Sequence, residues 1–305
     1  MGMMHTVLGE KPADQTGRIL PHEHLVCDYT RVKPETNLVL NDIDLAVTEL
    51  VPFTEAGGTV IVDVTPRDLG RDPSRLTEIS RRSGVDVVMG TGWYRRSFYL
   101  DHIDTTPTAE LAEGMVVELT EGASTEDGRV PAGIIGEIGV DGSFVSALEE
   151  RVLRAAGAAS KATGAAVTTH AAMHPVGLAQ LDLLLDAGAS PDRVVIGHAD
   201  TFLDVDYHTA VLRQGANIQF DTVDRPHLNP DERRAAALAG LIRAGWLERL
   251  LISSDRCFRS DLRAFGGGGY AVTLTAFCDR LRGLGVTDEE IDVMTIDNPR
   301  RIVSW

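Results

Sequence analysis

The segment at residues 17–25, GRILPHEHL, places two histidines at the end of a short apolar run with the composition of a β-strand. Residues i and i+2 of a strand face the same side, so His22 and His24 can reach one metal ion while Glu23 points away. A single histidine at a strand end is more often a hydrogen-bonded core residue than a ligand. The metal hypothesis therefore depends on how the other strands end.

Seven further apolar or β-branched runs follow along the chain. Together with the first run they predict strands over residues 18–24, 59–64, 85–90, 132–138, 165–170, 193–198, 216–221 and 250–255. Amphipathic stretches of helical length lie between them, for example at residues 42–56, 147–163, 177–187, 230–244 and 270–284. Alternating β and α units with nearly continuous apolar strands indicate a parallel sheet covered by helices.

Eight such units predict an α/β fold, namely a (β/α)8 TIM barrel. An open doubly wound sheet is the alternative, but that fold would be expected to carry a glycine-rich phosphate turn after an early strand, and no strand end shows one. The segments that look most flexible, residues 121–128 and 266–269, are short. We therefore expect a single domain over residues 1–305.

Potential metal ligands stand at the ends of five of these strands. In such barrels the carboxyl ends of the strands meet at one face, where the reacting groups lie. An unpaired imidazole or carboxylate is costly inside a strand, and convergence on metal ions would remove that cost at all positions together. The candidates are His22, His24, Glu137, His170, His198 and Asp255.

The distribution of lysine limits the chemistry. Lysine occurs only at positions 11, 33 and 161, none of which is a strand end. No strand end can therefore supply a carboxylated lysine to a metal centre or a Schiff-base lysine to an aldolase. Glu137 offers two oxygens and could bridge two ions instead.

Seven short motifs add a family resemblance. They are GRILPHEHL (17–25), GIIGEIG (133–139), VTTH (167–170), VVIGHAD (194–200), LLISSD (250–255), GGGGY (266–270) and NPRRI (298–302). In this order and spacing, the chain from about Thr6 to its C-terminus resembles the phosphotriesterase-like (phosphotriesterase-related) family of the amidohydrolase superfamily. The phosphotriesterase itself has a carboxylated lysine where this chain has Glu137.

The resemblance implies a distorted (β/α)8 barrel with two divalent metal ions, usually Zn²⁺. His22, His24 and Asp255 would bind the more buried ion, and Glu137 would bridge the two. His170 and His198 would bind the more exposed ion. The resemblance also implies that Asp255 is catalytic, accepting the proton of a hydroxide shared by the ions and delivering it to the leaving group.

We accordingly expect a hydrolase in which the bridging hydroxide attacks a carbonyl, most plausibly a lactonase or an N-acyl amide hydrolase. Organophosphate triester hydrolysis by the same machinery is the alternative; it ranks lower because relatives with glutamate at the bridge are generally poor at it. A barrel that binds a ligand without turnover is an alternative of another class. The intact ligand set, including Asp255, argues against it.

Loops that follow the strands determine the substrate. Each loop arginine could be a solvated residue paired with one of the 45 acids. Their shared position above the metals nevertheless predicts a small anionic substrate, bound through arginine forks on a carboxylate, sulfonate or phosphate. The substrate-binding candidates are Trp93, Tyr94, Arg95, His174, Arg225, Arg256 and Arg259.

Composition excludes several partners. A formal charge of −16 gives no basic footprint for nucleic acid and opposes attachment to an anionic membrane. No run reaches transmembrane length, and three cysteines without metal-type spacing argue for a reducing compartment. We expect a cytoplasmic protein with a small-molecule substrate and, because relatives are often dimers, a possible homodimer.

Overall fold

The computed structural model describes residues 2–100 and 102–305. Its centre is an eight-stranded sheet in the order β14-β13-β12-β11-β10-β7-β6-β3, in which all ladders are parallel. The strands are β3 (Arg18–Glu23), β6 (Gly58–Asp63), β7 (Asp86–Thr91), β10 (Ile134–Gly139), β11 (Val167–His170), β12 (Val194–Gly197), β13 (Asn217–Phe220) and β14 (Leu250–Ile252). The predicted α/β barrel is thus confirmed as a single domain with eight parallel strands.

The barrel is closed by hydrogen bonds beyond the last ladder. The hydroxyl of Ser253, just after β14, accepts from the amide of His22 at 3.2 Å and donates to the carbonyl of His22 at 2.9 Å. The amide of Asp255 also donates to the His22 carbonyl, at 3.2 Å. The first and last strands of the sheet therefore meet beside the predicted metal ligands.

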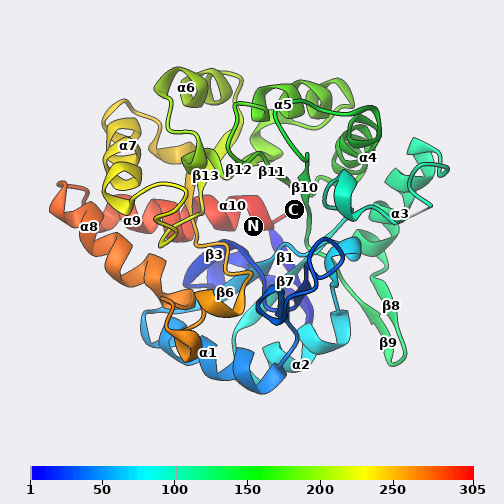
Figure 1. Ribbon diagram of the computed structural model, residues 1–305, viewed down its shortest axis with the longest axis horizontal. Coiled ribbons are helices and arrows are strands. Elements are labelled where there is room, and N and C mark those ends of the chain that lie inside the picture. Colours follow the sequence, from blue (N-terminus) through cyan, green and yellow to red (C-terminus); the bar gives the residue numbers. More distant parts are fainter. Residues whose placement is uncertain (1, 101) are drawn as a thin grey trace.

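Helices surround the strands (Figure 1). They are α1 (Ile43–Glu55), α2 (Pro73–Ser83), α3 (Thr108–Thr120), α4 (Ala147–Thr163), α5 (Gly177–Asp186), α6 (Val205–Arg213), α7 (Asp231–Arg243), α8 (Cys278–Gly283), α9 (Asp288–Asp292) and α10 (Asn298–Val303). Several begin with an N-cap side chain, such as Asp42 before α1 and Ser146 in the capping box of α4, which satisfies amides that the first turn leaves unpaired.

Strand residues alternate between two apolar clusters, as the period of two requires. Leu20, Ile61 and Val87 pack in the large cluster that includes the helices. Ile19 and Val60 belong to a smaller cluster on the opposite face of the sheet, inside the barrel. Both faces of every strand are thus buried, which explains the nearly continuous apolar runs.

The two ends of the chain cover one end of this interior cluster. Met4 of β1 (Met3–Thr6) packs there together with Ile302 and Val303 of α10. β1 pairs with β2 (Gly9–Pro12), and the ring of His5 stacks on Trp305 with 4.3 Å between centroids. The N- and C-termini accordingly lie close together (Figure 1).

The sequence-based boundaries need three revisions. Residues 121–128, expected to be flexible, contain β8 (Ala123–Thr125) and part of β9 (Gly128–Val130), which form a hairpin. The helix expected over 270–284 consists of a 3₁₀ turn (Tyr270–Val272), a π-helix (Thr273–Phe277) and α8. A further two-stranded ladder joins β4 (Cys27–Asp28) to β5 (Val39–Leu40).

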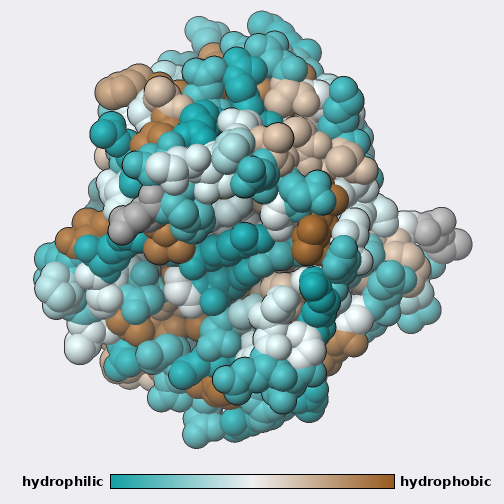
Figure 2. Space-filling model, turned by 90° about the vertical axis from the view of Figure 1, so that its right-hand side faces the viewer, coloured by the Kyte–Doolittle hydropathy of each residue, from teal (hydrophilic) through white to brown (hydrophobic). Residues whose placement is uncertain are grey.

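The face of the molecule drawn in Figure 2 is largely polar. Figure 2 shows a face on which hydrophilic residues predominate and apolar residues occur in small separate groups. Within residues 2–100 and 102–305, no helix combines the length and the apolar character needed to cross a bilayer.

Candidate metal centre

The six predicted ligands lie together at the carboxyl ends of their strands. His22 lies in β3, Glu137 in β10, and His170 is the last residue of β11. The other three follow β3, β12 and β14 directly or within three residues; they are His24, His198 and Asp255. All are buried except His170, whose side chain is 14% exposed.

Glu137 stands between two groups of imidazoles. Its Oε2 lies 3.5 Å from His22 Nε2, and its Oε1 lies 3.5 Å from His24 Nε2. On the other side, Oε2 lies 3.0 Å from His170 Nδ1 and 3.3 Å from His198 Nε2. Among the described residues, Glu137 is thus the one carboxylate within 4 Å of all four of these histidines.

Asp255 completes the first group. Its Oδ1 lies 3.2 Å from His24 Nε2 and 3.9 Å from His22 Nε2. Ligands about 2.0–2.1 Å from a tetrahedral zinc ion are roughly 3.4 Å apart, so these separations are those of atoms around one ion. Both ring nitrogens of His22 and the Nε2 atom of His24 also have no hydrogen-bond partner, although a buried polar atom is normally satisfied. The residues present therefore fit a divalent metal ion on each side of Glu137.

Irregular backbone directs these ligands inward. The ladder between β3 and β6 shifts register between Leu20 and Glu23, around His22. The ladder between β10 and β11 shifts between Ile135 and Ile138, around Glu137. Such irregularities re-aim a side chain, and they are frequent next to active sites.

Two ligands also adopt a backbone conformation that side chains rarely take. His198 has φ 54° and Asp255 has φ 50°, both in the left-handed region. Each such residue costs on the order of 1–3 kcal/mol and persists only where the surrounding structure enforces it. Hydrogen bonds enforce it here: both oxygens of Asp221 accept from the His198 amide, at 3.0 and 3.1 Å.

Asp221, directly after β13, contacts two of the histidines. Its Oδ1 is hydrogen-bonded to His198 Nδ1 at 2.7 Å, and its Oδ2 lies 3.2 Å from His22 Nδ1 without forming a hydrogen bond. A carboxylate accepts hydrogen bonds, so the bond to Asp221 places a proton on His198 Nδ1 and directs His198 Nε2 toward the cluster. His24 is oriented separately, by the Thr65 hydroxyl 2.8 Å from its Nδ1.

Glu23 points away from the cluster, as the strand alternation predicted. Its Oε1 accepts from the amide and hydroxyl of Ser254, both at 2.8 Å, and lies 2.8 Å from the Ser253 hydroxyl oxygen, while Oε2 accepts from the Arg256 amide at 2.7 Å. Burial raises the pKa of Glu23, and these donors act in the opposite direction. Glu23 thus ties the end of β3 to the segment that carries Asp255.

The pKa values of the cluster shift in both directions. Burial would raise the pKa of Glu137, but the surrounding imidazoles, His170 first, hold it well below its usual range. Burial lowers the pKa of His170 to about 4, whereas Asp255 and Glu137 outweigh burial at His24 and raise its pKa to about 10, and Asp221 raises that of His198. A metal ion binds the neutral imidazole, so metal binding at His24 and His198 should release protons.

Three of the predicted substrate residues follow β7. Tyr94 is buried, and its hydroxyl lies 3.2 Å from His170 Nδ1. Arg95 is half-buried, stacks over the Tyr94 ring at 4.9 Å and lies 3.6 Å from Asp141. Trp93 is buried beneath the guanidinium of Arg67, 5.0 Å from its ring. Tyr94 is thus the member of this group that contacts a ligand of the cluster.

The remaining candidates have different surroundings. Arg225 and Arg256 are buried and paired within the chain: Arg225 Nη1 lies 2.9 Å from Asp255 Oδ2, and Arg256 Nη2 donates to the Val223 carbonyl at 2.6 Å. His174 is exposed in the loop between β11 and α5. The sequence alone is compatible with solvated loop arginines, but Arg225 and Arg256 are both buried.

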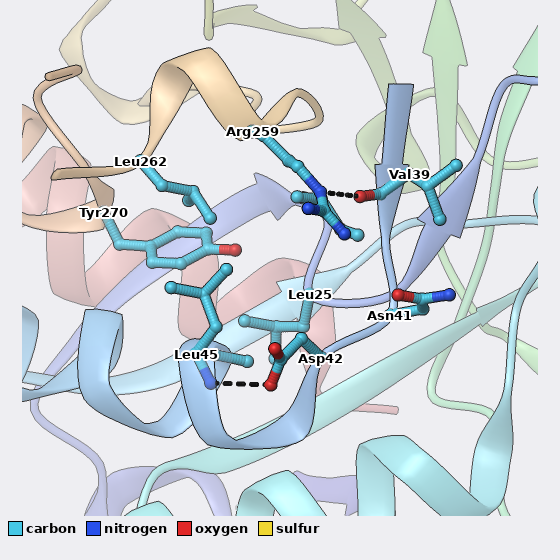
Figure 3. A pocket seen from close by; sticks show the side chains of 10 residues that line it. Leu25, Val39, Asn41, Asp42, Leu45, Arg259, Leu262 and Tyr270 are labelled. Atoms are coloured by element: carbon cyan, nitrogen blue, oxygen red, sulfur yellow. Dashed lines mark hydrogen bonds between the residues drawn. The ribbon is translucent and has the colours of Figure 1, made fainter. Parts of the chain in front are cut away.

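Arg259 lines a small pocket that none of the six predicted ligands lines (Figure 3). Its Nε donates to the Val39 carbonyl at 3.0 Å. The pocket has a volume of about 10 Å³, close to the minimum for one water molecule and too small for a substrate. Across it lies Tyr270, whose hydroxyl donates to the His24 carbonyl at 2.8 Å.

Sequence reasoning missed Asp221 as part of the site, although it ended a predicted strand at this residue. It also missed the outer pair of Asp200 and Arg234, both fully buried, in which Asp200 accepts from the amides of Asp221 and Thr222 at 3.3 and 3.0 Å. The sequence signal that could have identified Asp221 is its position as a carboxylate at the end of an apolar strand.

A barrel that gathers buried histidines and carboxylates at the carboxyl ends of its strands defines a metal-dependent hydrolase, and the comparisons with known proteins agree. The chain belongs to the phosphotriesterase family, whose model matches residues 2–303. This confirms the family resemblance of the motifs.

Three relatives illustrate the range of the family. The phosphotriesterase homology protein of Escherichia coli is 36% identical to this chain, and the alignment covers 94% of this chain and 97% of the relative. The crystal structure of that protein, with phosphate in the active site, superposes on this one with a TM-score of 0.91 at 35% identity. The superposition covers 95% of this chain and 99% of the crystallised chain. An N-acetyltaurine hydrolase of Dictyostelium discoideum is 29% identical over 90% of this chain and 77% of its own. A phospho-furanose lactonase of Mycoplasmopsis synoviae is 26% identical over 98% and 91%.

Proposed function

We propose that this protein hydrolyses a small anionic N-acyl amide or lactone with the help of two divalent ions, zinc in the first instance. The observation that carries the proposal is the position of Glu137 between His22 and His24 on one side and His170 and His198 on the other. Such a pair of ions lowers the pKa of a shared water and polarises the oxygen of a carbonyl.

The residues of the chain supply the rest of the chemistry. Asp255 presents Oδ1 to the cluster, where it can accept a proton from the attacking water and return it to the leaving amine or alcohol. The Tyr94 hydroxyl, beside His170, lies where it can donate a hydrogen bond to the substrate. The buried setting strengthens these interactions because water is largely excluded.

In this proposal, Arg95 binds the anionic group of the substrate. Unlike Arg225 and Arg256, Arg95 is half-buried, and within residues 2–100 and 102–305 the one carboxylate that forms an ion pair with it is Asp141, at 3.6 Å. A sulfonate or phosphate could compete for this guanidinium. The names of two relatives point the same way, since acetyltaurine carries a sulfonate and a phospho-furanose lactone a phosphate. Trp93, His174 and Arg259 remain predicted contacts.

The test is a pH-stat assay on protein loaded with Zn²⁺, offered N-acetyltaurine, N-acetyl amino acids and phosphorylated sugar lactones. Proton release that is lost on chelation and restored by Zn²⁺ supports the proposal. Asp255→Asn should keep the fold, by circular dichroism, but lose turnover by about 10³-fold or more, since it removes both a ligand and a proton acceptor. A fully active, metal-loaded Asn variant would exclude the assigned role.

Paraoxon in the same panel tests the alternative activity. A neutral triester has no anionic group for Arg95, so we expect it to be hydrolysed more slowly than the best anionic substrate. The reverse order would favour a phosphotriesterase, and metal loading without any turnover would favour a binding protein.

A further inference from the structure

Arg225, in the segment after β13, contacts Asp255 at two points. Its Nη1 lies 2.9 Å from Asp255 Oδ2, and its Nη2 donates to the Asp255 backbone carbonyl. The side chain of Arg225 is only 8% exposed. One guanidinium therefore binds both the carboxylate and the main chain of the same residue, which a planar fork with several fixed donors can do and a single ammonium cannot.

This contact divides the two oxygens of Asp255. Oδ2 is engaged by Arg225, while Oδ1 remains directed at the imidazoles, 3.2 Å from His24 Nε2. Asp255 also has a left-handed backbone, with φ 50°, which a side-chain-bearing residue does not adopt without support. The bond from Arg225 to the Asp255 carbonyl supplies part of that support.

Arg225 is itself held on its other side. Its Nη2 lies 3.0 Å from Asp261 Oδ2, which also accepts from the amides of Cys257 at 3.2 Å and Phe258 at 3.0 Å. The guanidinium packs 5.4 Å from the centre of the Phe258 ring. Arg225 is thus fixed between Asp255 and the turn that follows it.

We propose that Arg225 is a positioning residue that fixes which oxygen of Asp255 faces the metal cluster, rather than a residue that binds substrate. The proposal deepens the proposed function and relies on it for the kinetic part of its test. The remaining part of the test needs no substrate, because a substitution of Arg225 should change the metal site itself.

The experiment compares Arg225→Ala and Arg225→Lys with the wild type and with Arg233→Ala, a control that removes an exposed arginine of α7. Each protein is stripped with chelator and reloaded with Co²⁺, whose visible absorption reports coordination geometry. We expect an altered spectrum and weaker retention of Co²⁺ in both Arg225 variants, and wild-type behaviour in Arg233→Ala.

Kinetics give the second readout. A displaced catalytic group costs on the order of 10²-fold, so kcat of Arg225→Ala should fall by about that factor while KM changes little. Added methylguanidinium should restore part of kcat in the Ala variant, because it can occupy the vacated position. The Lys variant, which keeps the charge but not the fork, should retain an intermediate kcat.

Two results would overturn the proposal. One is an unchanged cobalt spectrum and affinity in both Arg225 variants; the other is a raised KM with wild-type kcat, which would make Arg225 a substrate contact. Should Arg225→Ala not fold, the spectrum of Arg225→Lys decides. If the wild type hydrolyses none of the panel, the proposed function fails, while the cobalt comparison still decides on Arg225.

Discussion

Asp221→Asn should weaken metal binding on at least one side of Glu137. Asp221 contacts His198 Nδ1 at 2.7 Å and His22 Nδ1 at 3.2 Å, and these histidines lie on opposite sides of Glu137. An asparagine has no charge and can turn only one acceptor oxygen toward the two rings, so at least one imidazole loses its orienting partner.

The magnitude follows from the number of contacts. Loss of a hydrogen bond behind a metal-bound histidine typically costs 10- to 100-fold in affinity, or about 1.4–2.7 kcal/mol. Because His198 is the histidine that is hydrogen-bonded to Asp221, we expect a loss in this range for the ion on its side of Glu137. Dialysis against graded concentrations of a zinc chelator, followed by elemental analysis, measures the two affinities.

Glu118→Gln is a suitable control for this prediction. Glu118 is also a buried carboxylate with several donors, including the Thr91 hydroxyl and Arg71, but these contacts lie outside the metal cluster. It should lower the free energy of unfolding without changing zinc affinity. Wild-type affinity of both sites in Asp221→Asn would refute the assigned role of Asp221.

Three further outcomes are expected. Glu137→Gln should reduce bound zinc from about two equivalents to about one, since a neutral amide is a poor bridge between two cations; two tightly bound equivalents by elemental analysis would contradict the bridge. Arg95→Ala should raise KM for an anionic substrate by roughly 10- to 100-fold, from the 1.5–3 kcal/mol of a charged hydrogen bond, and leave a neutral lactone unaffected. Burial raises the pKa of Asp68 to about 7, so the folded state keeps a proton that the unfolded state releases and stability falls as pH rises from about 4 to 7, by at most about 1.4 kcal/mol per unit. Asp68→Asn, which can still accept from the Tyr94 amide, should flatten that slope in urea unfolding, and an unchanged slope would exclude Asp68 as its source.

The strand ends were the most predictable part of the molecule. Alternation and apolar runs located all eight strands of the sheet, and the carboxyl-end rule located positions that the fold brings together, such as Glu137 and Asp255, which both lie within 4 Å of His24. These signals are local in sequence, since each depends on a few consecutive residues. Family membership then confirmed the same barrel.

Partners that come from distant segments could not be predicted in this way. Asp221 has its contacts on β3 and after β12, and nothing in its own neighbourhood indicates them. The burial of the loop arginines could not be predicted either. A basic residue after a strand has the same local sequence pattern whether it is half-buried, like Arg95, or fully buried, like Arg256. Register shifts around His22 also depend on the neighbouring strand rather than on the residue sequence alone.

The closure of the barrel bears on how the chain acquires its structure during synthesis. The amide of His22 finds its acceptor on Ser253, 231 residues later, and Met4 is covered by Val303 of the last helix. A nascent chain emerging from the ribosome therefore exposes the inner side of β3 until residues 253–303 have also been synthesised. Contacts of such long sequence separation make folding slow and leave apolar surface accessible meanwhile, so this protein should depend on chaperones more than its final compactness would suggest.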